Sequence, residues 1–113
     1  MDQTPVAASA HYQVKRIETV MAGSDVQARL FTLAPQDCIP WHYHTQSADH
    51  YFVLAGTLMV QTREPDETST IELGGDRRIT PGTAHQISNR SDVDCRFLLL
   101  QGVGKRDWVK VDG

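Results

Sequence analysis

Hydrophobic and polar residues alternate along most of this chain, in short runs that turn residues separate. A period of two indicates β-strands with one buried face. It is clearest in 26–33 and 95–101, and three further runs, 50–54, 57–62 and 85–88, are rich in residues that favour strands. No stretch keeps a helical period over three turns. The pattern therefore predicts an all-β fold, built as a sandwich or barrel of short strands.

Other segments favour extended structure through their composition, and we expect further short strands at 12–17, 38–44, 70–73, 76–79 and 108–111. The last of these is expected to pair with a sheet edge. The polar stretch 63–70 contains Pro65 and predicts a loop. Residues 1–10 are small and polar and predict a flexible N-terminal arm, which leaves 11–113 as a single domain.

The composition is that of an ordinary globular protein, with 113 residues, 40% of them hydrophobic and 22% charged. A net charge of −3 without a basic stripe argues against a nucleic-acid partner. The longest apolar run, 97–100, is far too short to span a membrane, so we expect no membrane partner. The N-terminus lacks a secretory pattern and there are only two cysteines, which together predict a reducing, cytoplasmic setting.

His42 and His44 are two residues apart in an extended segment, so their side chains share one face about 7 Å apart. A metal about 2.1 Å from each imidazole nitrogen fits between two such side chains. Asp49 follows across a turn that lets the chain reverse and bring a carboxylate beside them. Imidazole and carboxylate are usual ligands of borderline divalent metals, so this segment is a candidate metal site.

Spacing alone leaves other interpretations open. Pairs of the form His-x-His occur by chance on surfaces, and an acidic residue near a turn is commonplace. His85 has to reach the other residues through tertiary folding, and taken by itself it is typical of a loop histidine. A metal site and an ordinary polar surface therefore both remain possible on the residues alone.

Two stretches of the chain resemble the paired motifs of the cupin superfamily. The first stretch contains, in motif register, His42, His44, Asp49 and Gly56. The second contains Gly74, Gly82, His85 and Asn89. The two motifs occur in the family's order and span residues 36–89. On these motifs the chain is similar to a small single-domain cupin of the conserved-barrel, bacterial type.

The resemblance implies a double-stranded β-helix, or jelly-roll, barrel that is usually dimeric. It also implies one divalent transition metal ion (Fe, Mn, Zn or Ni), held by His42, His44, Asp49 and His85. The family has Glu where this chain has the shorter Asp49, which then ligates directly, through water or only by supporting a ligand. A bulge there would exchange Asp49 with His50. Two turn positions also depart, because Gln36 replaces a Gly and Thr80 replaces a Pro.

Alternation places Asp49, Tyr51 and Val53 on the inner face of their strand, with His50, Phe52 and Leu54 outward. Tyr51 is therefore a candidate catalytic residue, as a proton donor or a substrate hydrogen bond, and core packing is the alternative. The outward row suggests a homodimer. No cofactor site other than the metal is predicted.

Three classes of function remain open. The first is a metal-dependent dioxygenase, isomerase or lyase that acts on a small polar organic substrate. The second is a non-catalytic module that binds or senses a small-molecule ligand. The third is an inactive barrel whose dimer interface is the function. The fold alone cannot choose among them, because one fold hosts many chemistries.

Overall fold

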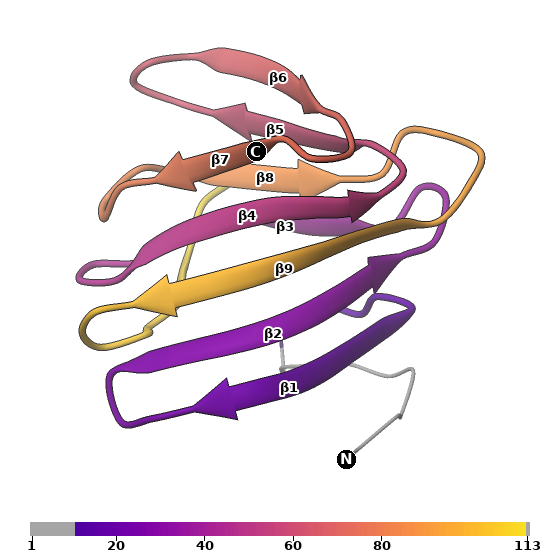
Figure 1. Ribbon diagram of the computed structural model, residues 1–113. Coiled ribbons are helices and arrows are strands. Elements are labelled where there is room, and N and C mark those ends of the chain that lie inside the picture. The colour runs from indigo at the N-terminus through magenta and orange to yellow at the C-terminus, as the bar shows by residue number, and fades with distance from the viewer. Residues whose placement is uncertain (1–10, 113) are drawn as a thin grey trace.

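The computed structural model describes residues 11–112, which form two five-stranded sheets that face each other (Figure 1). One sheet has the strand order β1-β2-β9-β4-β7, and the other has the order β10-β3-β8-β5-β6. All paired strands are antiparallel. This arrangement is the jelly-roll barrel expected from the sequence. The expected arm at residues 1–10 lies outside the described part of the chain.

The strands are short, and most are joined by tight turns. In chain order they are β1 (Arg16–Ala22), β2 (Val26–Leu33), β3 (Cys38–Tyr43), β4 (Ala48–Ala55), β5 (Leu58–Thr62), β6 (Glu67–Ile71), β7 (Asp76–Ile79), β8 (His85–Ser88), β9 (Cys95–Gly102) and β10 (Val109–Lys110). The strands expected at 26–33, 50–54, 57–62, 85–88 and 95–101 coincide with β2, β4, β5, β8 and β9 in that order, so those predictions are confirmed. The short β10 pairs with the edge of β3, as expected for the segment 108–111. Within residues 11–112 no helix is long and apolar enough to cross a membrane.

Two expectations about the strands were wrong. The first strand begins at Arg16 and runs to Ala22, not over 12–17, because its pairing with β2 starts opposite Thr32. The stretch 63–70 is not all loop, since residues from Glu67 onward belong to β6 and pair with β5. β6 is an edge strand with a mostly exposed surface, so polar residues can occupy it without loss of burial.

The hydrophobic core fills the space between the two sheets. Phe31 and Phe97 stack at its centre with ring centroids 4.9 Å apart, and both side chains are fully buried. Leu33, Leu58 and Ile87 are also completely buried. Each such side chain contributes about 1.5–3 kcal/mol through burial, so this cluster is what holds the sheets together.

Along β4 and β9 the inward-facing positions change from apolar to polar toward one end of the barrel. The facing pairs, in that order, are Val53–Phe97, Tyr51–Leu99 and Asp49–Gln101. All six of these side chains are buried. The alternation that builds the core therefore continues past it and delivers a carboxylate and an amide into the interior.

Candidate metal centre

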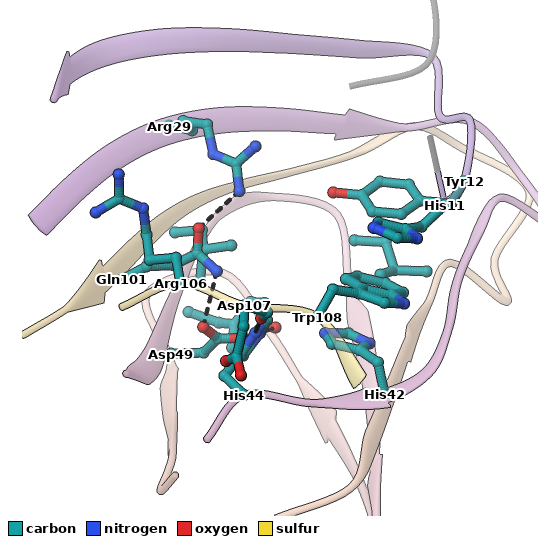
Figure 2. A pocket seen from close by; sticks show the side chains of 13 residues that line it. His11, Tyr12, Arg29, His42, His44, Asp49, Gln101, Arg106, Asp107 and Trp108 are labelled. Carbon is teal, nitrogen blue, oxygen red and sulfur yellow. Dashed lines mark hydrogen bonds and ion pairs between the residues drawn. The ribbon is translucent and has the colours of Figure 1, made fainter. Parts of the chain in front are cut away.

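A cavity of about 270 Å³ lies at the polar end of the barrel (Figure 2). Its walls come from both sheets and from the segment that precedes β10. Asp49 and Gln101 line one part of it, and His42, His44 and Trp108 line another. Buried polar groups therefore face a space large enough for a small molecule.

Four potential ligand atoms converge at this cavity. One atom from each of His42, His44, Asp49 and His85 lies within 4.8 Å of all the others, and all four residues are buried. The convergence depends on strand pairing, since His42 on β3 is directly opposite His85 on β8. A bulge in β3 between Ile39 and His42 lets both of these side chains be buried.

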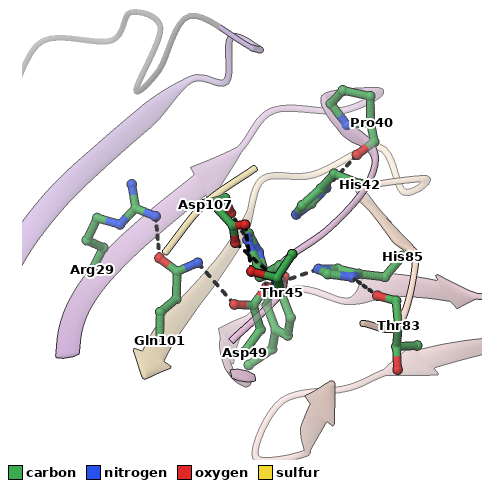
Figure 3. A network of polar contacts seen from close by, with 11 residues as sticks. Arg29, Pro40, His42, Thr45, Asp49, Thr83, His85, Gln101 and Asp107 are labelled. Carbon is green, nitrogen blue, oxygen red and sulfur yellow. Dashed lines mark hydrogen bonds and ion pairs between the residues drawn. The ribbon is translucent and has the colours of Figure 1, made fainter. Parts of the chain in front are cut away.

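The carboxylate of Asp49 is the hub of the polar network (Figure 3). Its Oδ2 atom is 3.2 Å from Nε2 of His44 and 3.0 Å from Nε2 of His85. The Tyr51 hydroxyl donates to the same oxygen at 2.8 Å. Nε2 of Gln101 donates to the other oxygen, Oδ1, at 3.0 Å. Every partner of this carboxylate is therefore a side chain.

Each imidazole is oriented by a backbone carbonyl on its far side. Nδ1 of His42 donates to the Pro40 carbonyl at 2.7 Å, and Nδ1 of His85 donates to the Thr83 carbonyl at 2.8 Å. Nδ1 of His44 donates to the carbonyl of Asp107. A carbonyl only accepts, so these contacts assign the proton to Nδ1 in each ring. The Nε2 lone pairs of all three neutral rings are then free to ligate.

A divalent cation fits this donor set. Two Nε2 lone pairs that face one carboxylate oxygen repel it unless a positive charge lies between them. A metal ion bound at Nε2 of each histidine and at Oδ2 of Asp49 would satisfy every one of these acceptors at once. The hydrogen bonds at Nδ1 are the outer contacts that usually fix the orientation of ligating imidazoles.

The electrostatic environment shifts the pKa values of His42 and His44 in opposite directions. Burial, together with the nearby His85, lowers the pKa of His42 to about 3, so that ring is neutral at any ordinary pH. Burial alone would lower the pKa of His44, but when no cation is bound the Asp49 carboxylate favours a proton on the facing Nε2 and raises that pKa above the usual value. Burial opposes ionisation of Asp49, yet the rings of His44 and His85 beside its Oδ2 hold its pKa well below the usual range. The hub is therefore a carboxylate.

Tyr51 is fully buried, with its hydroxyl bound to Asp49. Burial and the negative charge of Asp49 raise its pKa well above the ordinary value, so the phenol stays protonated. His50, next to Asp49 in sequence, points away from the site. It bonds to Asp76 at 2.7 Å and stacks on Phe52. Asp49, not His50, thus faces the interior.

The sequence analysis missed most of the residues that line the cavity, among them Arg29, Gln101 and Arg106. Period-two alternation carries a usable signal for two of them. Arg29 shares the inward side of β2 with Phe31, and Gln101 shares the inward side of β9 with Leu99. Arg106 lies in a loop and has no such signal.

The chain belongs to the cupin domain family, because the model of that family matches residues 29–101. A comparison with curated proteins found no match. Among solved structures, an uncharacterized conserved protein with a double-stranded β-helix domain from Klebsiella pneumoniae subsp. pneumoniae MGH 78578 is 16% identical. Its alignment covers 96% of this chain and 92% of that one, with a TM-score of 0.77.

Two other solved structures are also similar to this chain. KdgF from Halomonas sp. is 15% identical over 93% of this chain and 88% of that one, with a TM-score of 0.74. An oxalate oxidase in complex with the substrate analogue glycolate is 18% identical, with a TM-score of 0.69. That alignment covers 77% of this chain and 46% of that one. At these identities the likeness establishes the fold.

Proposed function

We propose that this cupin binds one divalent transition metal ion (Fe, Mn, Zn or Ni) through Nε2 of His42, His44 and His85 and through Asp49. We propose further that it acts on a small polar organic substrate as a dioxygenase, isomerase or lyase. The observation that carries the proposal is the convergence of four buried donors within 4.8 Å. The free thiols of Cys38 and Cys95 support a reducing, cytoplasmic setting.

When bound, such an ion supplies Lewis-acid polarisation or, with a redox-active metal, a route for dioxygen chemistry. The chain's own residues do the remaining work. The backbone carbonyls behind the imidazoles hold each ring in one tautomer. Tyr51 and Gln101 hold the Asp49 carboxylate from both oxygens. The surrounding core keeps bulk water from the donor atoms, since all four residues are buried.

Elemental analysis of untagged protein tests the metal assignment. Wild-type protein is expected to contain one equivalent of metal, and His42→Ala or His85→Ala to contain almost none. His50→Ala is the matched control, because it removes an imidazole from β4 that faces away from the site. Full occupancy in the His42 and His85 variants would reject the ligand assignment. A subsequent screen of small acids, sugars and phenols tests for metal-dependent turnover.

A non-catalytic binding module is the second candidate, and the environment of Tyr51 favours it. Its hydroxyl is bound to Asp49 and its pKa is raised well above the usual value, which makes it a poor proton donor. Tyr51→Phe separates the two functions. Loss of turnover with metal retained supports a catalytic role for Tyr51, whereas unchanged turnover assigns the hydroxyl to positioning of Asp49. Metal-dependent ligand binding with no turnover in the whole screen would favour the module.

We also propose that the chain forms a homodimer through the outer face of the sheet that contains β2, β9 and β4. Cross-strand pairing aligns Leu30, Leu98 and Phe52 in one apolar row on that face, and Leu100 beside it is 38% exposed. Light scattering at micromolar concentration should give a dimer. Leu98→Glu should give a monomer, while Leu73→Glu, in an exposed turn, should not. A wild-type monomer would remove the proposal.

A further inference from the structure

Three buried guanidinium nitrogens have no hydrogen-bond partner among residues 11–112, and two of them belong to side chains at the cavity. These two are Nε of Arg29, on β2, and Nη1 of Arg106, in the segment between β9 and β10; the third, Nε of Arg16, lies elsewhere. Both side chains line the cavity of the proposed metal centre (Figure 2). Burial of a charged donor without an acceptor is unfavourable. The pair therefore requires acceptor atoms that the described chain does not supply.

Arg29 is oriented in advance for such an acceptor. Its Nη2 donates to Oε1 of Gln101 at 2.6 Å, and Tyr12 lines the same cavity beside it. The guanidinium also lies 5.0 Å from the centroid of the Phe31 ring. Gln101 in turn donates to Asp49, so one amide links Arg29 to the proposed metal ligands. A ligand bound at Arg29 is thereby close to the metal centre.

The charges around the cavity favour an anion. The ionised side chains that line it are Arg29 and Arg106, which are positive, and Asp49 and Asp107, which are negative. The Asp107 carboxylate already accepts bonds from the backbone and hydroxyl of Thr45. The two pairs of opposite charge cancel, so a bound divalent ion leaves two unbalanced positive charges in the site. A neutral or cationic ligand would not balance them.

The size and the walls of the cavity limit which anions can bind in it. Its volume of about 270 Å³ is below the range of about 300–1,000 Å³ that is usual for drug-sized ligands. Ile39 and Leu99 give it apolar walls. The ring of Trp108 is stacked on both faces, by His42 at 3.6 Å and by His11 at 4.7 Å, so it offers no free face for a ligand ring. These features suit a small organic anion.

We infer that the ligand of this site is a small organic carboxylate, bound by Arg29 and Arg106, with the rest of the molecule directed at the metal centre. Guanidinium groups match the two oxygens of a carboxylate in both geometry and charge. The inference rests on the proposed function for its second contact, at the metal, and for the net positive charge of the loaded site. The arginine contacts themselves do not depend on it.

Matched acids and amides test the inference by calorimetry on the full-length, metal-loaded protein. The pairs are succinate and succinamide, lactate and lactamide, and benzoate and benzamide. At least one acid should bind at millimolar concentration or below, and its amide should bind at least tenfold more weakly. Amides that bind as tightly as their acids, or an absence of binding by all the acids, would overturn the inference.

Three variants locate the binding site. Arg29→Gln and Arg106→Gln should each weaken binding of the acid about tenfold or more. Arg96→Gln, which removes an exposed arginine from β9, is the control and should bind like wild type. Thermal unfolding of each variant shows that the barrel is intact. Equal binding by folded Arg106 and Arg96 variants would overturn the assignment.

Two further measurements keep this inference separate from the metal assignment. Metal content is determined in the same samples, and inorganic phosphate is titrated beside the acids. Arginine-dependent binding of acids to a protein that holds no metal would support the inference while the proposed function fails. Metal-loaded protein that binds acids no better than amides would overturn the inference alone. Phosphate that binds as tightly as the acids would overturn the choice of carboxylate.

Discussion

Asp49 and Asn89, one from each motif, are two buried polar residues with opposite surroundings. Asn89 is 0% exposed and Asp49 is 1% exposed. The amide of Asn89 donates to the carbonyls of Leu33 and Val93 at 2.9 and 2.7 Å, and its oxygen accepts from the backbone of Ser91 at 3.0 Å. Asp49, in contrast, bonds only to side chains.

The difference shows that the buried polar group of Asn89 stabilises a loop, whereas that of Asp49 belongs to a group of side chains able to hold a metal. A backbone partner has a fixed position and a single role, so the Asn89 contacts fix a loop and leave no donor atom free. The histidines around Asp49 keep lone pairs that the chain does not use. One region is complete as it stands, while the other is able to hold a cation. The predictions below test this contrast.

Asn89→Leu should give the largest effect, and it should act on stability alone. Leucine has a similar size but removes the side-chain donor to the Leu33 carbonyl and the acceptor of the Ser91 N–H, and leaves the Val93 carbonyl with the Ser91 hydroxyl alone. At about 1–3 kcal/mol for each, we expect a loss of about 3 kcal/mol or more in the free energy of unfolding. Urea denaturation measures this, and elemental analysis of the folded fraction should give unchanged metal content. A loss below about 1 kcal/mol would contradict the structural role.

Asp49→Asn should act on metal binding and leave the fold intact. The amide preserves the shape of the side chain and its Oδ1 contact with Gln101, but removes the negative charge. We expect metal affinity to fall by about 100-fold or more, since loss of a supporting residue alone costs about 10–100-fold. Competition with a chromophoric chelator measures the affinity. A loss of about 10- to 100-fold would assign Asp49 a supporting role instead of direct ligation, and a smaller loss would exclude both roles.

Low pH should release metal while the loop around Asn89 is unaffected. Protons compete with metal for imidazole nitrogen, and the pKa of His44 lies above the usual value, so this ring is protonated first as pH falls. Metal affinity should therefore fall from about pH 7 to pH 5. None of the hydrogen-bond partners of Asn89 titrates in this range. Equilibrium dialysis that gives constant affinity down to about pH 4 would contradict histidine ligation.

Gln101→Leu tests the support given to Asp49 by its outer oxygen. The variant loses the donor to Oδ1 and the acceptor for Arg29 in one change. Metal affinity should fall about tenfold, at the low end of the range for supporting residues. Gln86→Leu is the control, because the Gln86 side chain bonds to Gln61, and both residues lie in the sheet that does not contain Gln101. Equal metal affinity of the two variants in the same chelator titration would exclude a supporting role for Gln101.

Gln36→Gly should give the smallest effect, an increase in stability. Gln36 has a φ of 71° and donates from its backbone to the Asn89 carbonyl at 2.8 Å, so it belongs to the structural region. Side chains disfavour that conformation, whereas glycine adopts it freely. We expect a gain of about 0.5–1 kcal/mol in the free energy of unfolding. A lower melting temperature would contradict this account of the turn.

Local alternation predicted most of the strands, and the resemblance to the two cupin motifs predicted the barrel and the group of His42, His44, Asp49 and His85. Parity along β4 was enough to place Asp49 and Tyr51 inside and His50 outside. The contacts of Asp49 with Gln101, 52 residues away, depend on strand register, which parity does not fix. Arg106 and the Asp107 carbonyl lie in a loop, so their positions follow only from the folded barrel. The first part of the edge strand β6 was assigned to a loop, and only its end overlaps the expected strand at 70–73, because its exposure removes the hydrophobic signal.

The carbonyl that orients His44 comes from Asp107, 63 residues later in the chain. Ribosomes make proteins from the N-terminus, so all four proposed ligands are translated well before this carbonyl and before Trp108, which covers His42. An emerging polypeptide thus presents a His44 ring that is not yet held in one tautomer. On the proposed ligand assignment the site is complete only after β10 has docked on β3, so we expect metal to be loaded late in biogenesis.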